Sequence, residues 1–332
     1  SVRFKYSEVF KKVTSNATGY ANNVFTQLGM YWQLHLAYDR GYNFKTYNTY
    51  QEIFDNIFFA RVDSYARNPE SAPAPNSIAL TLTGDRDQKL MRLASAAAER
   101  DLTEFFIRWG MIPNEETLSY VGQFEKETRA IYYVDDDARV YEIEHGTGDT
   151  INGKSVVTAQ AEAQASDVTI TIDCNANEEV IQGYEVTRVF IEHGEERREI
   201  AGFTQENTFR DSVAFAANRV ITYEITAIDK FMNRSEVCQT NTVKIGGDGK
   251  QDKSHWSVST NLISEEDVSV EGTEDLPCET TTSTKERMID NDNSTVFHGS
   301  VSGEDPYIIL ELNQIMEVSA FDYNGEALGN YK

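Results

Sequence analysis

The first 125 residues of the chain repeat their hydrophobic positions with the period of an α-helix. Residues 20–38 and 50–67 each place apolar side chains every three to four positions. Between them and the next helical stretch lies NPESAPAPNS, which holds three of the chain's six prolines and predicts a loop. The two apolar stripes consist of Val24, Leu28, Tyr31, Trp32 and His35 or Leu36, and of Ile53, Phe54, Ile57, Phe58, Val62 and Tyr65.

Capping residues mark a third and a fourth helix. Asp85 can accept hydrogen bonds from free amides at the start of a long helix that runs through Trp109. Gly110 fits the left-handed position that ends such a helix, and Asn114 begins a short helix over 115–124. Large side chains dominate protein cores. We therefore expect a helical core that includes Trp32, Phe105, Phe106 and Trp109.

From about residue 130 the hydrophobic period switches to two. The runs AIYYVD and ARVYEIE alternate around a group of aspartates, which predicts a β-hairpin at the end of the helical region. Regularly spaced strand-like runs follow, and about seven short strands in roughly 90 residues favour a β-sandwich. The clearest of these runs are Val168–Cys174, Tyr184–Glu192, Arg198–Phe203, Val220–Asp229 and Thr240–Ile245.

The stretch GGDGKQDK is the clearest boundary in the chain, because it is glycine-rich and polar. Beyond it, HWSVS, STVFHG, YIILELN and VSAFDYN are strand-like runs separated by acidic loops. We expect a multidomain chain with an α-helical subdomain over 1–150, which ends in the hairpin, and a β-sandwich over 151–247. A small third domain covers 252–332.

The third domain is the most acidic part of the chain. The chain has a net charge of -24, and residues 252–332 hold 4 basic and 17 acidic side chains. A nucleic-acid partner needs a basic surface, so we expect none. An acidic segment is compatible with a solvated surface or with a bound cation such as calcium. No stretch approaches the roughly 18 apolar residues of a transmembrane segment, and none is expected.

Cysteine and histidine spacing predicts no catalytic site in this chain. Cys174, Cys238 and Cys278 form no C-x-x-C pair, which excludes zinc ribbons and thioredoxin chemistry. Cys174 and Cys238 can pair if their strands are neighbours, and free thiols are equally compatible with the sequence. None of the five histidines lies in H-E-x-x-H. His35 lies on an apolar helix face, so we expect a core or interface histidine whose hydrogen bonds are satisfied.

Two stretches of the helical region, NNVFTQLGMYWQLHLAYDRGY and DLTEFFIRWGMIP, resemble the C-terminal half of the enhancin-like, mucin-degrading zinc metallopeptidases. The resemblance covers about residues 20–125, with helices at Phe25–Tyr38 and Leu102–Gly110. It implies a parent enzyme that binds zinc through H-E-x-x-H and a downstream glutamate. That half of the family is absent here. The resemblance therefore implies zinc in the parent enzyme, with ligands outside this chain, and no catalytic residue within it.

The middle run AANRVITYEITAIDKFMNRS resembles a fibronectin type III module, with Tyr223 at the place of that family's corner tyrosine. This resemblance implies an immunoglobulin-like β-sandwich. The runs WSVSTNL, MIDNDNSTVFHGS and DPYIILELNQIMEVSAFDYN resemble a discoidin-like, galactose-binding module, of which about half is present. That family wraps a structural calcium, so Asp290, Asp292 and Thr295 are its implied oxygen donors. An ordinary turn rich in aspartate and asparagine is the alternative.

Together these features predict the C-terminal fragment of a secreted or cell-surface zinc metallopeptidase that acts on glycoproteins such as mucins. Its expected partner is a glycoprotein or glycan, and its expected location is extracellular. The alternative is a non-catalytic, glycan-binding or adhesive surface protein whose helical segment is only a scaffold. The N-terminal run SVRFKYSEVF lacks the pattern of a signal peptide, which indicates a removed signal or an excised piece.

Overall fold

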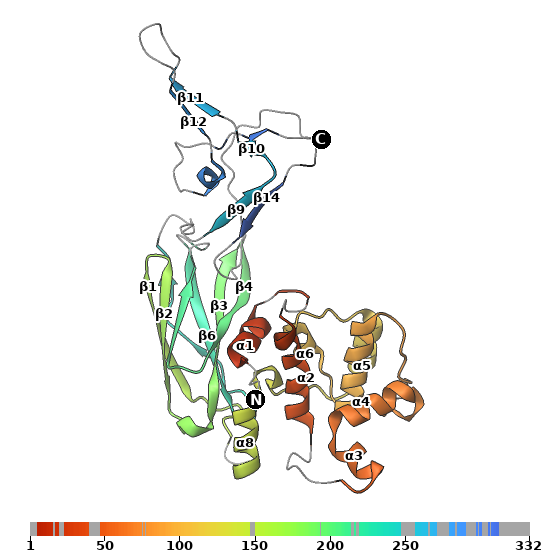
Figure 1. The fold of residues 1–332 in the computed structure, drawn as a ribbon. Helices are drawn as coiled ribbons and strands as arrows, with labels where there is room; N and C mark the ends of the chain where they lie inside the picture. Colours follow the sequence, from red (N-terminus) through yellow and green to blue (C-terminus); the bar gives the residue numbers. More distant parts are fainter. Residues whose placement is uncertain are drawn as a thin grey trace. The chain divides into compact units, whose positions relative to one another are not determined.

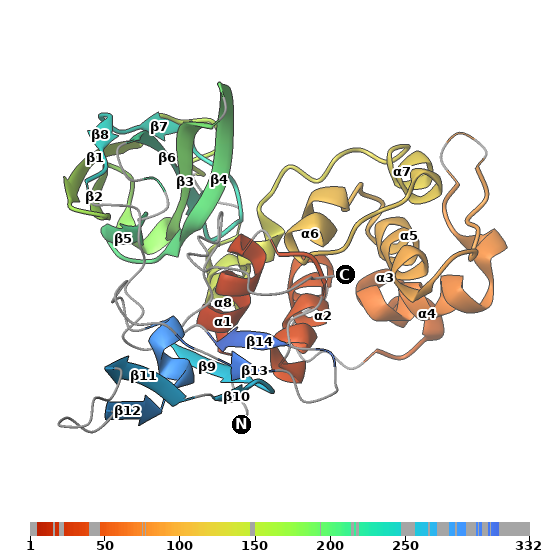
Figure 2. The ribbon, with the colours of Figure 1, turned by 90° about the horizontal axis from the view of Figure 1, so that it is seen from above.

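The computed structural model describes two compact units of the chain. They comprise Ser1–Ser212 with Arg219–Gly246, and Val213–Asn218 with Gly247–Lys332. Within the described residues the first unit contains α-helices and two antiparallel sheets, and the second contains short antiparallel strand pairs (Figures 1 and 2). The protein is therefore a mixed, multidomain structure. The described residues are 5–15, 17–19, 23–39, 47–74, 76, 78–146, 150–192, 194–213, 216, 219–246, 256–264, 266–270, 279–282, 284–289, 297, 299–300, 305 and 307–311.

The helical part occupies residues 5–146 of the first unit. Short 3-10 turns accompany its helices at η1 (Pro69–Ser71) and η3 (Ile131–Tyr133). None of the helices in the described ranges is long and apolar enough to cross a membrane. The α-helices are α1 (Tyr6–Thr14), α2 (Val24–Tyr38), α3 (Tyr50–Asn56), α4 (Phe58–Arg67), α5 (Arg86–Ala98), α6 (Thr103–Arg108), α7 (Glu115–Val121) and α8 (Asp136–His145).

The predicted helix caps are confirmed. The Asp85 side chain accepts hydrogen bonds from the amides of Asp87 and Gln88 at 2.9 and 3.0 Å. Asn114 accepts one from the Thr117 amide at 2.9 Å, and α7 follows it. Gly110 has φ +81°, the left-handed conformation expected after the last turn. Local side-chain chemistry thus sets these helix ends.

Two stretches predicted as single helices are each divided. Ile57 is extended and separates α3 from α4, where the Asp39 carboxylate accepts a hydrogen bond from the Phe58 amide at 2.7 Å. Glu99 adopts φ +53° and ends α5, and Asp101 then accepts a hydrogen bond from the Thr103 amide at 2.9 Å. Carboxylates that cap a new helix compete with continuation of the old one. The periodicity continues across both breaks, so it does not reveal them.

The predicted hairpin at the end of the 1–150 subdomain is wrong. Residues 131–133 form η3, and Asp136–His145 form α8. Asp135 is the N-cap, because its carboxylate accepts a hydrogen bond from the Ala138 amide at 2.8 Å. The aspartates that follow it lie in the first turn, where the helix dipole favours negative charge. The aspartate run therefore starts a helix and does not form a β-turn.

Residues 157–244 form two antiparallel sheets that face each other and are called the sandwich below (Figure 1). One sheet has the order β1-β2-β5, and the other has the order β4-β3-β6-β7, with β8 also paired to β6. Val168, Ile170 and Ile172 alternate inward from β2 and are buried. The strands are β1 (Val157–Gln164), β2 (Asp167–Cys174), β3 (Ile181–Glu192), β4 (Glu195–Thr204), β5 (Thr208–Ser212), β6 (Val220–Asp229), β7 (Cys238–Gln239) and β8 (Val243–Lys244).

Tyr223 is fully buried in the sandwich, as expected for a corner tyrosine. Its hydroxyl donates to the Asp211 carboxylate at 2.9 Å, and the same carboxylate accepts from Arg188 Nε at 2.7 Å. Burial, reinforced by the nearby Asp211 charge, raises the pKa of Tyr223 well above its usual range. The Tyr223 hydroxyl thus donates to an acidic side chain that is itself paired with an arginine.

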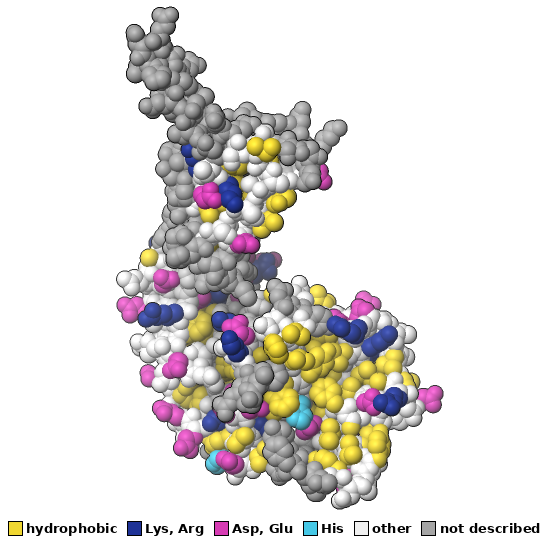
Figure 3. All heavy atoms as spheres, in the orientation of Figure 1, with side chains coloured by type: hydrophobic (Ala, Val, Ile, Leu, Met, Phe, Trp, Pro, Cys, Tyr) yellow, Lys and Arg dark blue, Asp and Glu magenta, His cyan; other side chains and the backbone are white. Residues whose placement is uncertain are grey.

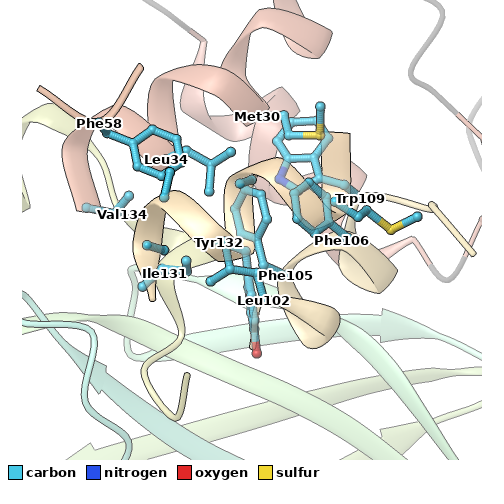
Figure 4. Close-up of a cluster of buried hydrophobic side chains, with 14 of the residues drawn as sticks. Met30, Leu34, Phe58, Leu102, Phe105, Phe106, Trp109, Ile131, Tyr132 and Val134 are labelled. Atoms are coloured by element: carbon cyan, nitrogen blue, oxygen red, sulfur yellow. The ribbon is translucent and has the colours of Figure 1, made fainter. Parts of the chain in front are cut away.

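The hydrophobic core runs from the helical part into the sandwich. Figure 4 shows its central side chains, drawn from α2, α4, α6, η3 and their flanking residues. Phe105, Phe106 and Trp109 are buried there, as predicted. The same cluster includes Ile228 and Met232, which lie in and just after β6. The helical part and the sandwich therefore share one core.

A partly buried polar network reinforces this contact and is called the junction below. Arg108 Nη2 donates to Glu185 Oε2 on β3 at 2.9 Å. Arg234, after β6, donates to Glu104 Oε1 on α6 at 2.6 Å. The Tyr132 hydroxyl donates to the same Glu104 oxygen at 2.8 Å and accepts from both arginines. Each charged side chain in the junction has a partner of opposite sign.

The second unit contains short strands and a 3-10 turn within its described residues. β9 pairs with β14, β10 with β13, and β11 with β12, each pair antiparallel. Ser257 Oγ donates to Glu311 Oε2 at 2.8 Å across the first pair. The elements are β9 (Ser257–Thr260), β10 (Ile263–Ser264), β11 (Glu266–Val270), β12 (Glu279–Thr282), η6 (Lys285–Met288), β13 (Gly299–Ser300) and β14 (Ile308–Glu311).

Candidate functional site

Helix α2 is predominantly apolar. Its sequence, VFTQLGMYWQLHLAY, contains no aspartate, glutamate, lysine or arginine. Asn23 begins the helix, because its side chain accepts a hydrogen bond from the Phe25 amide at 2.8 Å. A surface helix normally has a polar side, whereas a helix that is apolar all round is normally buried on all sides. We therefore compared which side chains of α2 are buried by the rest of the chain and which are exposed.

The inner side of α2 packs into the helical core. Gln33 donates from Nε2 to the Tyr132 carbonyl at 2.6 Å and accepts from Trp109 Nε1 at 3.1 Å. A Cβ atom on Gly29 would lie 2.7 Å from Val9 Cγ2, so glycine is needed for α1 to approach this closely. The buried residues of α2 are Thr26, Gly29, Met30, Gln33, Leu34 and Leu36.

The outer side of α2, called the α2 face, consists of Val24, Phe25, Leu28, Tyr31 and Trp32. Val24 is 59% exposed, Phe25 57% and Leu28 45%, whereas Tyr31 and Trp32 are half-buried. The apolar stripe found in the sequence is thus largely the solvent side, and the prediction that Trp32 is a core aromatic is only partly correct. Figure 3 shows hydrophobic side chains gathered over α2, α3 and α4.

His35 and Asp39 lie at the C-terminal end of the α2 face. The His35 Nδ1 and Asp39 Oδ2 atoms are 2.7 Å apart. The Trp32 ring lies against the His35 ring, with centroids 4.6 Å apart, and its Nε1 donates to Asp136 Oδ1 on α8 at 3.0 Å. Tyr6 donates to the other Asp136 oxygen at 2.8 Å. His35 is therefore a satisfied histidine, as predicted for a core or interface position.

The described residues do not fit a zinc site. No group of three His, Cys, Asp or Glu side chains that could hold a metal is found among them. The His35–Asp39 pair offers two such groups, and the Asp39 carboxylate also caps α4. No step of zinc chemistry is assigned to these side chains. What the arrangement offers is an apolar surface that ends in a fixed polar cluster.

The sequence-predicted calcium donors, Asp290, Asp292 and Thr295, lie outside the described residues, so calcium binding stays a prediction. The nearest described segment before them is η6, followed by Ile289. Cys174 and Cys238 are free thiols. Cys174 ends β2 and Cys238 begins β7, which lie in different sheets.

Sequence reasoning missed the exposure of the α2 face. A stripe of period 3.6 shows that a helix has an apolar side, but it does not show which side the rest of the fold covers. One signal was present. Residues 24–38 contain no acidic or strongly basic residue, which is unusual for a helix that meets solvent.

No family model matches the chain, and no curated protein matches it. Among solved structures, it is similar to the M60 catalytic domain of Clostridium perfringens ZmpC in complex with the sialyl T antigen. The identity is 23% over 70% of this chain and 40% of that chain, with a TM-score of 0.45.

The ZmpB metallopeptidase of the same organism shows 23% identity over 70% of this chain and 40% of that one, with a TM-score of 0.44. A longer ZmpB structure, which includes CBM51-1 and CBM51-2, shows 20% identity over 91% of this chain and 28% of that one, with a TM-score of 0.45. The chain spans less than half the length of each of these structures.

Proposed function

We propose that the helical part is the non-catalytic, C-terminal portion of a zinc metallopeptidase domain that acts on glycoproteins such as mucins. In this proposal the α2 face packs against the zinc-bearing portion of the same protein. The observation that carries the proposal is the exposure of Val24, Phe25 and Leu28 on a helix without charged residues. Exposed apolar side chains that gather on one surface are typical of a site that another polypeptide covers.

Two further features support this role. The helices that resemble the enhancin-like family, Phe25–Tyr38 and Leu102–Gly110, correspond to α2 and to α6 with its cap. The fixed polar cluster of His35, Asp39 and Asp136 borders the α2 face and can orient it against a partner surface. Zinc in the parent enzyme activates a water molecule for hydrolysis, with ligands and a general base supplied by the other portion.

The proposals for the two β-modules rest on their strand arrangement and on one buried tyrosine. The facing sheets β1-β2-β5 and β4-β3-β6-β7, with Tyr223 buried between them, support a fibronectin type III module. The antiparallel pairs of the second unit are compatible with a partial discoidin-like β-sandwich that binds carbohydrate and calcium. Both module types are common in secreted proteins that act on glycans, so the proposed location is extracellular.

The test combines this chain with the separately produced region of its parent that carries H-E-x-x-H. We expect the two to associate and to cleave mucin only together. Leu28→Glu should abolish the association, because it places a charge on the α2 face. Val140→Glu is the matched control, because Val140 is also 45% exposed on a helix, α8, outside the α2 face.

Two outcomes would contradict the proposal. One is zinc-dependent, chelator-sensitive cleavage of mucin or casein by this chain alone. The other is association that Leu28→Glu leaves unchanged. If the chain binds glycans but never associates with a zinc-bearing region, the adhesive alternative is the better description.

A further inference from the structure

A cavity of about 410 Å³ lies in the first unit, and its lining includes no residue of the α2 face. Its apolar lining comes from Val13 at the end of α1, Ile107 on α6, Met111 and Ile112 after α6, and Ile200 on β4. This volume lies within the range of small-molecule pockets, about 300–1,000 Å³. The cavity can therefore hold a ligand with an apolar body of several carbon atoms.

One wall of the cavity is held in place by Gly110. Gly110 and Ala17 both line the cavity, and a Cβ atom on Gly110 would lie 2.5 Å from the Ala17 carbonyl oxygen. The Gly19 amide donates to the Gly110 carbonyl at 2.8 Å. Because only glycine permits this approach, the segment containing Ala17 is fixed against the end of α6. The wall is a defined part of the fold.

Two cations accompany this apolar lining. Lys12 Nζ donates to the Ala17 carbonyl at 3.1 Å and would lie 2.9 Å from a Cβ on Gly110, which places the ammonium at the cavity wall. Burial lowers the pKa of Lys12. No carboxylate among the described residues forms an ion pair with it in this structure.

Arg108 is the second cation and also lines the cavity. Its Nη2 donates to Glu185, which balances one positive charge within the junction. Its Nη1 is buried and has no hydrogen-bond partner among the described groups. Because this atom has no accessible surface, it does not face the cavity, and the guanidinium contributes positive charge to the cavity wall rather than a free donor. Among the described residues at the cavity wall, the Arg108 charge is balanced by Glu185, and the Lys12 ammonium is the positive charge that remains without an ion pair.

We propose that the cavity binds an amphiphilic monocarboxylate, a class that includes medium-chain fatty acids. The apolar tail lies among Val13, Met111 and Ile200, and the carboxylate accepts a hydrogen bond from the Lys12 ammonium. One negative charge matches the one uncompensated positive charge, and charge-assisted hydrogen bonds of this kind are the strong ones. This site is independent of the proposed metallopeptidase role.

The test uses octanoate as the probe and the full chain as the receptor, in isothermal titration. Octanoate should bind, 1-octanol should bind more weakly, and acetate should not bind. Lys12→Met keeps the apolar stem and removes the charge, so it should weaken octanoate about tenfold and leave octanol unchanged. Lys11→Met is the matched control, because the neighbouring Lys11 is exposed and pairs with Glu8. It should leave octanoate binding unchanged.

Methyl NMR locates the ligand independently. Octanoate should shift the methyl signals of Ile107, Ile112 and Ile200 and leave that of Ile143, on α8, unchanged. If Lys12→Met does not fold, as judged by circular dichroism, Lys12→Gln replaces it. The proposal is overturned if octanoate does not bind, if octanol binds equally well, if both lysine variants behave alike, or if the shifted signals lie elsewhere.

Discussion

The helical part has two contrasting surfaces, the junction and the α2 face. The junction is closed by the sandwich and combines aromatic packing with paired charges, such as Arg108 with Glu185. The ring of Tyr133 stacks on Phe203 of β4 there, with centroids 4.0 Å apart. The α2 face has no charged residue and exposes Val24 and Phe25 by more than half.

The difference shows how each surface is specified. Hydrogen bonds between paired charges are directional, so they form in only one arrangement of the helices and strands. The junction therefore fixes how the sandwich packs against the helical part. Apolar contacts are not directional. On the α2 face, the polar cluster at His35 and Asp39 is what can fix the orientation of a partner. We infer that the junction stabilises the folded chain, whereas the α2 face binds a partner polypeptide.

The largest loss of stability is expected from a substitution in the hydrophobic core beneath the junction and the α2 face. Trp109 is 1% exposed and donates to Gln33 on α2. Trp109→Ala should lower the free energy of unfolding by about 3–5 kcal/mol, because it removes a large buried side chain and leaves a cavity. Urea unfolding, followed by the helical circular dichroism signal, measures this. Trp256→Ala, in the second unit, should leave that transition in place, and equal losses would contradict the assignment of Trp109 to the helical core.

Breaking the junction should have the next largest effect. Arg108→Met should cost about 3 kcal/mol, because it leaves the largely buried Glu185 carboxylate without its arginine. The double variant Arg108→Met with Glu185→Gln should recover part of the loss, since no charge is then left unpaired. A double-mutant cycle in urea measures the coupling. Additive losses would show that the ion pair does not hold the sandwich to α6.

A smaller loss is expected inside the sandwich. Tyr223→Phe removes the hydroxyl that donates to Asp211 and should cost about 1–2 kcal/mol. Asp211 keeps its bond from Arg188, so the loss should remain moderate. Thermal unfolding of Tyr223→Phe beside Tyr184→Phe, another buried tyrosine of the sandwich, on β3, provides the comparison. A loss no larger than that of the control would contradict the role of the buried hydroxyl.

The junction should also make stability depend on pH. Burial alone would raise the pKa of Glu104, but the Arg234 charge and the Tyr132 hydroxyl outweigh it and lower that pKa. A carboxyl with a lowered folded pKa contributes stability above its unfolded pKa, about 4.3, and loses it as the pH falls further. Glu104→Gln should therefore be less stable at neutral pH and should flatten the acid limb of the stability curve. An unchanged acid limb in urea titrations below pH 5 would contradict this.

Much of the local structure could be predicted from sequence, and most of the long-range structure could not. Asp85, Gly110 and Asn114 act on neighbouring backbone groups, so their effect is visible in the sequence. The strands around Val168–Cys174 and Val220–Asp229 alternate cleanly, because one side of each is buried. The aspartates after Val134 misled the prediction, since aspartate favours both turns and helix starts.

The candidate sites were predictable only in part. The junction depends on Glu104 and Arg234, which are 130 positions apart in the sequence, and no local pattern relates them. The cavity at Lys12 depends on a glycine at 110 and a strand residue at 200, which only the fold brings together. Helix α2 could be predicted as a helix, but its open side depends on what the rest of the fold leaves uncovered.

The smallest loss of stability is expected from a substitution on the α2 face. The comparison with a buried residue of the same helix distinguishes a role in folding from a role in association. Leu28 and Leu34 are the same residue type in the same helix, yet Leu28 is 45% exposed and Leu34 is fully buried. Leu34→Ala should cost about 2–5 kcal/mol, whereas Leu28→Ala should change stability by about 0.5 kcal/mol or less. Urea unfolding of the two variants side by side measures the difference. A large loss for Leu28→Ala would mean that this chain already covers its α2 face, and the reason to expect a partner there would disappear. A negligible loss, together with weaker association, would show that the exposed leucine contributes to binding rather than to folding.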